Sequence, residues 1–175
     1  MTNTTVLNKA ADNIRILAAS MVEKAKSGHP GGAMGGADFV NTLFAEFLVY
    51  DPSDPKWINR DRFFLDPGHM SPMLYSVLAL AGKFTLDELK QFRQWGSPTP
   101  GHPEVDVMRG IENTSGPLGQ GHAMAVGAAI AERFLVARFG DWMAHKTYAF
   151  NSGRDFSRGW THCRLFRFEQ SDHVL

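Results

Sequence analysis

Short apolar segments alternate with amphipathic helices along this chain, and the alternation limits its fold more than any other feature. Apolar residues recur at helical spacing over residues 8–26, and a denser apolar pattern over residues 38–49 predicts a largely buried helix. Two short runs containing aromatic residues, at 62–65 and 147–150, are typical of buried strands. Helices that alternate with such strands predict an α/β fold, a parallel sheet with flanking helices.

Three further helices are predicted, over residues 71–81, 85–94 and 122–138. The second of them begins with Thr85 and Glu88, whose spacing is that of a capping box. The third follows a glycine-rich segment and carries aliphatic residues on its inner faces. In parallel sheets, ligands bind at the carboxyl ends of strands, on the loops that lead into helices.

The composition argues against several classes of protein. A net charge of +0 gives no support for a nucleic-acid-binding or polybasic membrane surface. The N-terminus lacks the pattern of a signal peptide, and no apolar stretch is long enough to span a bilayer. The only cysteine, Cys163, leaves no intrachain disulfide and no cysteine-based zinc site. We therefore expect a cytoplasmic protein that binds neither nucleic acid nor membrane.

The first candidate site is the segment GPLGQG at residues 116–121. A glycine-rich loop that leads into a helix presents backbone N–H groups and the positive end of the helix dipole to an anion. Phosphate or diphosphate binding is one interpretation. The alternative is a tight turn that only lets two elements pack closely.

Three histidines form the second candidate site. His29 and His102 each lie between glycine and proline, and His69 follows a glycine at the expected end of a strand. Such histidines are unlikely core residues of a helix, and loops carry a large share of functional residues. Imidazoles can bind phosphate or sugar hydroxyls and transfer protons near neutral pH. Each alone could be a surface histidine that caps a turn, but three of one kind predict convergence.

Two other histidines are weaker candidates. His122 is expected in the first turn of a helix, and His145 on the surface before a strand. The histidines show no HExxH or similar spacing, so we predict no metal ligand among them.

Four segments together resemble the successive N-terminal blocks of the transketolase family, in the family's order and at its spacing. They are SGHPGGAMGGAD, RDRFFLDPGHMSPMLYS, FRQWGSPTPGHPE and TSGPLGQGHAMAVGAAIAE. The resemblance covers residues 8–150, and the combination of SGHPG, TPGHPE and GPLGQG is highly specific. Dihydroxyacetone synthase and 1-deoxyxylulose-5-phosphate synthase share parts of it, and the segment TPGHPE argues against the latter.

The resemblance implies a role for each matching position. His29 and His102 would be catalytic residues that contact the sugar substrate and assist proton transfer near the reacting carbon. His69 would lie against the cofactor, thiamine diphosphate, near its phosphates. Three residues of the glycine-rich segment would also line the cofactor: Gly116, Pro117 and Leu118.

The resemblance also implies an activity. The parent enzyme would be a homodimer of the pentose phosphate pathway that transfers a two-carbon ketol unit from a ketose phosphate to an aldose phosphate. In the family, Mg²⁺ or Ca²⁺ clamps the diphosphate, held by an aspartate just after the strand that matches residues 147–150. Here Asn151 follows instead, and Asp155 does not stand in the motif, so no metal ligand is assigned.

We expect the chain to consist of two segments of different character. Residues 1–150 would form the N-terminal part of the diphosphate-binding domain, and residues 151–175 a poorly ordered tail unrelated to the family. The tail shows no period of 2 or 3.6 residues. Plausible codons for it, read one nucleotide out of register, encode a sequence that resembles the family, so we predict a frameshift near the codon for Phe150.

Two interpretations of the whole chain stay open. In the first, it is a transketolase N-terminal segment, inactive alone, either truncated or one half of a split enzyme. In the second, it is a non-catalytic module that binds a phosphorylated ligand or pairs with full-length subunits.

Overall fold

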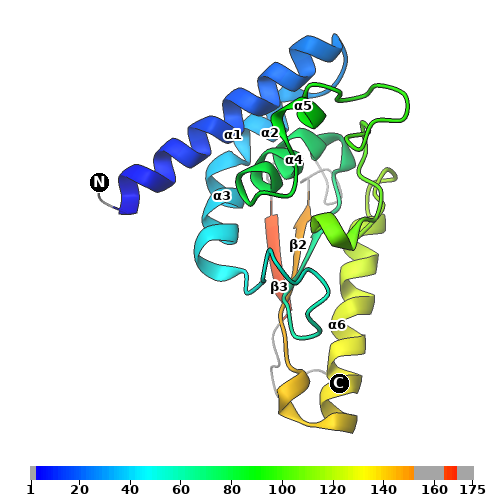
Figure 1. Cartoon of the computed structure of the whole chain (residues 1–175). Coiled ribbons are helices and arrows are strands. Elements are labelled where there is room, and N and C mark those ends of the chain that lie inside the picture. The colour runs from blue at the N-terminus through cyan, green and yellow to red at the C-terminus, as the bar shows by residue number, and fades with distance from the viewer. Residues whose placement is uncertain (1–2, 152–163, 169–175) are drawn as a thin grey trace.

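A computed structural model describes residues 3–151 and 164–168, and the side chains of the first of these ranges. In it, a small sheet lies between a group of helices on one face and a single long helix on the other (Figure 1). The helices are α1 (Asn3–Ala25), α2 (Pro30–Gly35), α3 (Ala37–Thr42), α4 (Ser71–Leu80), α5 (Leu86–Leu89) and α6 (Gln120–Phe139). Short 3-10 or π turns are η1 (Leu43–Phe47), η2 (Gly68–Met70), η3 (Val107–Arg109) and η4 (Asp141–Met143).

The sheet has the order β1-β2-β3, with strands β1 (Arg62–Leu65), β2 (Thr147–Asn151) and β3 (Arg164–Phe168). β1 and β2 are parallel, which confirms the predicted α/β architecture. β3 pairs antiparallel with β2 and comes from the segment in which we expected no regular structure. The rest of that segment lies outside the described residues, so its predicted disorder and frameshift origin stay predictions.

The two faces of the sheet pack on different layers. Phe63 and Leu65 of β1 join the main core with α1, α3 and α4, as do Tyr148 and Phe150 of β2. Phe64 points to the opposite face, where it forms a second cluster with Ala125 of α6 and Ala149. This alternation follows from the two-residue period of a strand.

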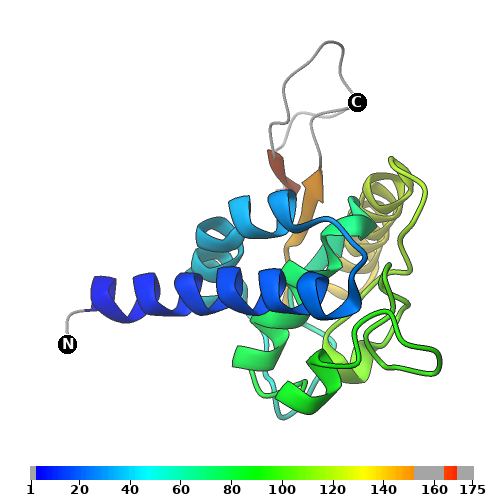
Figure 2. The same ribbon diagram turned by 90° about the horizontal axis from the view of Figure 1, so that it is seen from above.

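Helix α4 is the centre of the main core. Residues 71–78 are all buried, as expected for a helix that is apolar on every side. Above it lies α1, which buries Ala11, Ile14, Ala18 and Met21, at the spacing of one helix face. Figure 2 shows α1 running across the helices beneath it.

Helix α1 begins at Asn3, earlier than the predicted residue 8. Two other predicted helices also differ from the structure. The one expected over residues 38–49 is divided into α3 and η1, and α2 begins earlier, inside the glycine-rich stretch. Pro30 is well suited to a first helical position. Close packing explains two of the glycines: a Cβ on Gly32 would lie 3.0 Å from Met70 Sδ, and one on Gly36 would lie 2.5 Å from Met73 Sδ.

The second difference is the length of α5. The capping box of Thr85 and Glu88 is confirmed, but the helix ends at Leu89, well before the predicted Gln94. The chain reverses after this point, because Arg93 N–H donates to Thr99 O at 3.0 Å and Arg93 adopts a φ of 62°. Within the described ranges, no helix has the length and apolar character that a membrane crossing requires.

Candidate functional site

The candidate site lies at the carboxyl ends of β1 and β2. Asp66 N–H donates to Phe150 O at 3.0 Å, which continues the parallel pairing by one step. The buried side chain of Asn113 pairs with Leu65 in both directions, accepting from its N–H at 3.1 Å and donating to its O at 3.2 Å. Asn113 thereby holds the start of the glycine-rich loop against the end of β1.

Asp66 binds the N-terminus of α6. Its carboxylate is fully buried and accepts the N–H of Gly119 at 2.8 and 3.0 Å and the N–H of His122 at 3.2 Å. A Cβ on Gly121 would lie 2.7 Å from Asp66 Cα. The protein's own carboxylate therefore occupies the positive end of this helix. For residues 119–121 the structure favours the packing turn over a phosphate site at the helix end.

The three candidate histidines come together around Gly68. The rings of His29 and His69 meet edge to face, with their centroids 5.1 Å apart. A Cβ on Gly68 would lie 2.8 Å from Cδ2 of His102 and 2.9 Å from Oγ of Ser115. The loops after α1, after β1 and after α5 therefore converge on one point, as the sequence predicted.

The glycine-rich loop borders the same point. Ser115 N–H donates to Pro103 O at 3.0 Å, which ties this loop to the one that carries His102. Ser115 Oγ is buried and has no hydrogen-bond partner among the described residues. No atom lies within 4 Å of a Cβ placed on Gly116. Pro117 and Leu118 are exposed, so the loop closes one side of the site and leaves the other open.

The loop of His102 is fixed from α4. Ser71 Oγ donates to Gly101 O at 2.8 Å, and the Tyr75 hydroxyl donates to Pro100 O at 2.8 Å. His102 as a residue is exposed, but one edge of its ring packs against Gly68. That partial burial, with the positive charges of Arg93 and His29, lowers the pKa of His102. Its imidazole is therefore neutral at neutral pH.

The two weaker candidates have other partners. His122 Nδ1 lies 2.9 Å from Nδ2 of Asn151, at the end of β2. His145 follows η4 and lies 3.0 Å from Met143 O through its Nδ1. The described part of the chain contains no group of three or more histidine, cysteine, aspartate or glutamate residues able to hold a metal ion.

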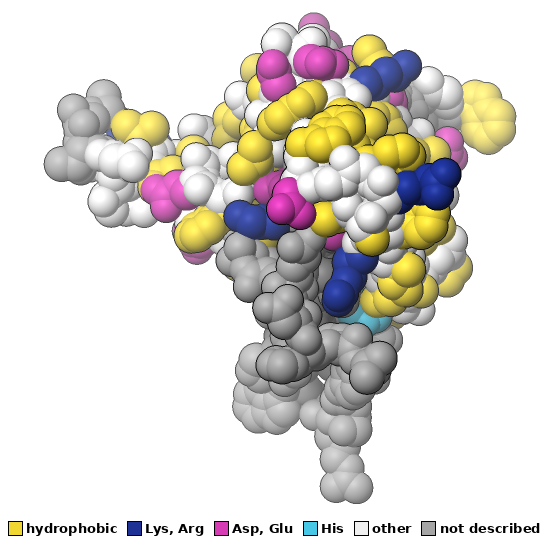
Figure 3. Space-filling model, turned by 90° about the horizontal axis from the view of Figure 1, so that it is seen from below, with side chains coloured by type: hydrophobic (Ala, Val, Ile, Leu, Met, Phe, Trp, Pro, Cys, Tyr) yellow, Lys and Arg dark blue, Asp and Glu magenta, His cyan; other side chains and the backbone are white. Residues whose placement is uncertain are grey.

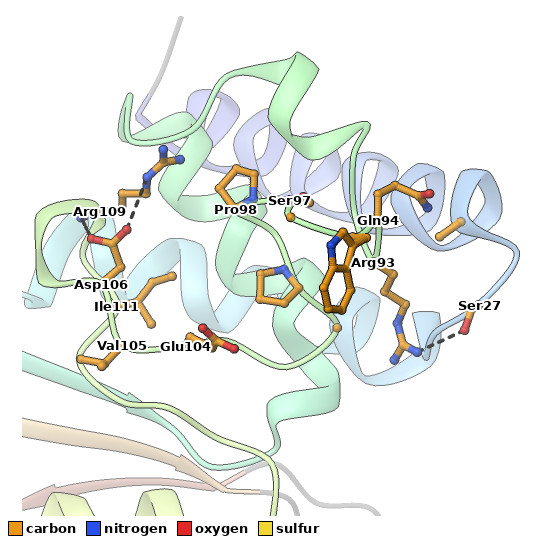
Figure 4. A pocket seen from close by; sticks show the side chains of 15 residues that line it. Ser27, Arg93, Gln94, Ser97, Pro98, Glu104, Val105, Asp106, Arg109 and Ile111 are labelled. Carbon is orange, nitrogen blue, oxygen red and sulfur yellow. Dashed lines mark hydrogen bonds and ion pairs between the residues drawn. The ribbon is translucent and has the colours of Figure 1, made fainter.

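A hollow lies beside the histidines. It has a volume of about 900 Å³ and is lined by the end of α1, the turn after α5 and the loop up to Ile111 (Figure 4). Its lining includes Ser27 and Gly101, close neighbours of His29 and His102, but none of the three imidazoles. The hollow therefore borders the loops of His29 and His102 without containing their imidazoles.

Sequence reasoning missed Asp66, Asn113 and Ser115 as site residues. Asp66 carried a usable signal, because a polar residue directly after a buried parallel strand stands where ligands and their supports gather. Asn113 and Ser115 carried none, since their roles depend on partners far away in the sequence.

The chain is similar in sequence to proteins of one family. A model of the family described as transketolase, thiamine diphosphate binding domain, matches residues 6–165. A transketolase of Geobacillus stearothermophilus is 51% identical over 155 residues, which are 86% of this chain and 23% of that protein.

Solved structures of transketolases superpose on the chain. One from Leishmania mexicana is 47% identical, with a TM-score of 0.80 over 84% of this chain and 23% of that one. One from Pichia stipitis, in complex with sedoheptulose-7-phosphate, is 45% identical, with a TM-score of 0.76 over 82% of this chain and 22% of that one. The chain thus spans about a quarter of these proteins, and it belongs to the transketolase family, as an N-terminal part of its thiamine diphosphate binding domain.

Proposed function

We propose that this chain supplies the substrate-facing and cofactor-facing histidine loops of a ketol-transferring enzyme. The parent enzyme moves a two-carbon unit from a ketose phosphate to an aldose phosphate, and the chain alone does not turn over. The observation that carries the proposal is the meeting of His29, His69 and His102 around Gly68. Three loops distant in sequence place imidazoles at one point, which a set of unrelated surface histidines would not do.

The residues at this point suit thiamine diphosphate. Ser115 Oγ is a buried polar atom that lacks a partner in the described chain, and the space beside Gly116 is open. His69 is half-buried, with its ring against that of His29. The cofactor, when bound, supplies the electron sink for breaking a carbon–carbon bond. It would be held by His69, Gly116, Pro117 and Leu118.

The diphosphate charge needs a further partner. Asp66 already neutralises the N-terminus of α6, so this helix end is closed to a second anion. We propose that Mg²⁺ or Ca²⁺ neutralises the diphosphate in the parent enzyme, with oxygen ligands from outside the described residues.

His29 and His102 are the proposed catalytic residues. A neutral imidazole such as that of His102 can accept a proton from a substrate hydroxyl or hydrogen-bond to it near pH 7. Both residues are exposed on the open side of the site, where a sugar phosphate can reach them. One solved relative carries sedoheptulose-7-phosphate, which is a ligand of this class.

We further propose that the parent enzyme is a cytoplasmic homodimer without nucleic-acid or membrane partners. Ile130 and Phe134, one turn apart on the outer face of α6, are 64% and 63% exposed and could be covered by a second subunit. Acidic and basic side chains are mixed on the face seen in Figure 3, which suits neither a polyanion nor an anionic membrane. The lone Cys163 suits a reducing compartment.

A chimera tests the ketol-transfer proposal. Residues 8–150 replace the matching segment of the Geobacillus transketolase, and ketol transfer between sugar phosphates is measured. We expect an active chimera, with His29→Ala and His102→Ala each lowering kcat/KM by about 100-fold or more. His145→Gln is the matched control, a histidine outside the site, and should leave the rate unchanged. An inactive but folded chimera, or equal losses in all three variants, would contradict the proposal.

The 175-residue chain itself is tested by calorimetry with thiamine diphosphate and Mg²⁺ and by the same assay. We expect no ketol transfer. Turnover by the chain alone would contradict the proposed division of labour. Two results would favour the non-catalytic module instead. One is binding of a phosphorylated ligand that survives His69→Ala. The other is co-purification with an intact transketolase when the chimera is inactive.

A further inference from the structure

Arg93 has an unusual backbone. Its φ of 62° lies in the left-handed region, which side chains with a Cβ seldom adopt. Its N–H donates to Thr99 O at 3.0 Å, which closes the turn between α5 and the loop of His102. Thr99 is fully buried and donates through its own hydroxyl to Glu88 O at 2.9 Å. The base of this turn is therefore anchored to α5, and the Arg93 side chain leaves it in a defined direction.

The guanidinium of Arg93 lies between two of the histidine loops. Its Nη1 donates to Ser27 Oγ at 3.1 Å, as Figure 4 shows. A Cβ on Gly101 would lie 2.9 Å from Nε and 3.0 Å from Cζ of the same guanidinium. A Cβ on Gly28 would lie 3.6 Å from Nε. The group is therefore packed against the residue that precedes each catalytic histidine.

We propose that Arg93 is a positioning residue that fixes the loops of His29 and His102 in one relative arrangement. The proposal rests on the function proposed above, because it assigns Arg93 a part in presenting those two imidazoles to the substrate. It explains why a glycine precedes His102: without a Cβ, the backbone of Gly101 can approach the flat guanidinium closely. The glycine before His29 has a different cause, because Gly28 adopts a φ of 130° and a Cβ there would lie 3.1 Å from Val22.

Arginine suits this role better than lysine does. Its planar group lies flat against the backbone while its separate N–H groups reach in different directions. Nε of Arg93 is buried and has no hydrogen-bond acceptor among the described residues. A left-handed backbone and an unpaired donor at one residue are costs that persist where the surrounding structure and the function require them.

The charge of Arg93 has a second effect. The charged or titratable groups that act on His102 are Arg93 and His29, and the neighbours on its other edge, Gly68 and Ser115, are uncharged. After partial burial of the ring, Arg93 is the largest cause of the lowered pKa of His102. The guanidinium thus places the imidazole and also contributes, after burial, to lowering its pKa.

The first test is the titration of His102 in the 175-residue chain, followed by NMR. Arg93→Asn removes the guanidinium and keeps a residue that tolerates the left-handed region. We expect the His102 titration midpoint to rise toward its ordinary value. Lys26→Asn is the matched control: Lys26 has a φ of 51° and pairs with Glu23, so its loss should leave His102 unchanged. An unchanged His102 midpoint in a folded Arg93→Asn variant would overturn the effect of the guanidinium on this pKa, and an unchanged rate of the chimera as well would overturn the positioning role.

The second test uses the chimera. Arg93→Asn should lower kcat/KM at least tenfold and shift the acid limb of its pH profile upward, whereas Lys26→Asn should do neither. Arg93→Lys keeps the charge and loses the planar group, so it should lower kcat/KM without moving the acid limb. Arg93→Lys also tests the positioning role if Arg93→Asn fails to fold. Full activity of the Arg93→Lys chimera would overturn that role.

The two tests separate two failures. If the unsubstituted chimera is inactive, the proposed ketol transfer fails, while the His102 titration still reports on Arg93. If the chimera is active and Arg93→Asn changes neither its rate nor the titration, only the role of Arg93 fails.

Discussion

The carboxylate of Asp66 accepts the backbone N–H of Gly119 through both of its oxygens, at 2.8 and 3.0 Å. The contact joins the end of β1 to the start of α6 across 53 residues of sequence. The Asp66 carboxylate also accepts the N–H of His122. One buried carboxylate therefore satisfies two of the donors that a helix N-terminus leaves unpaired. The same contact sets the position of the glycine-rich loop next to the histidines.

We expect Asp66→Ala to lower the free energy of unfolding by about 1–3 kcal/mol, because it leaves these buried donors without an acceptor. Asp66→Asn keeps one acceptor oxygen and should lower the free energy of unfolding by less than Asp66→Ala does. Urea denaturation of the 175-residue chain measures both. Asp54→Ala, at an exposed loop position, is the control. A loss no greater than that of the control would contradict the capping role.

Two glycines of α6 should respond in opposite directions to alanine. A Cβ on Gly121 would meet backbone atoms of the β1 loop: Asp66 Cα at 2.7 Å and Leu65 O at 3.0 Å. Backbone cannot yield as a flexible side chain can, so Gly121→Ala should cost about 1–3 kcal/mol. Gly127 has nothing within 4 Å and is inside the helix, so Gly127→Ala should stabilise by about 0.5–1 kcal/mol.

Denaturant midpoints of the two variants, compared with that of the unsubstituted chain, decide the matter. Stabilisation by Gly121→Ala would mean that the β1 loop and α6 are less closely packed than the structure shows.

Much of the fold could be predicted, because its elements depend on local patterns. The short run with aromatic residues at 62–65 located β1 to the residue, and the spacing of Thr85 and Glu88 located the start of α5. The convergence of three histidine loops was also predictable, since glycine or proline beside each one indicated a loop. What those histidines do stays a proposal.

The features that could not be predicted depend on tertiary contacts. Helix α2 forms in a glycine-rich stretch where Gly32 packs closely against Met70, and Gly36, which follows the helix, packs against Met73; no local propensity indicates these contacts. Asp66 looked like part of a turn, and only its distance from Gly119 in the folded chain shows it as a cap. The left-handed backbone of Arg93 is equally invisible in sequence.

Acid should destabilise the chain through His145. Burial is the main cause that lowers the pKa of His145, with a smaller contribution from Arg62, and Met143 O, Glu132 and Asp61 oppose the shift. The unfolded chain takes up a proton at about pH 6.5, whereas the folded chain does so only at lower pH. The stability contributed by neutral His145 is therefore present above that pH and is lost as the pH falls through the folded pKa.

Urea melts from about pH 7.5 to about pH 5.5 measure this loss. In the His145→Gln variant, the free energy of unfolding should depend less on pH. The dependence that remains includes the contribution of His102, whose pKa is also lowered. An identical slope with and without His145 would show that its imidazole titrates alike in the folded and unfolded chains.

The outer face of α6 should drive self-association of the isolated chain. Its exposed side chains Ile130 and Phe134 lie one turn apart, and burying each large apolar side chain is worth about 1.5–3 kcal/mol. Phe134→Lys should therefore shift the chain toward monomer in analytical ultracentrifugation. Val6→Lys is the control, since Val6 on α1 is 51% exposed and lies on a different helix. A monomeric chain before substitution, or an equal shift in both variants, would show that this face is not the site of association.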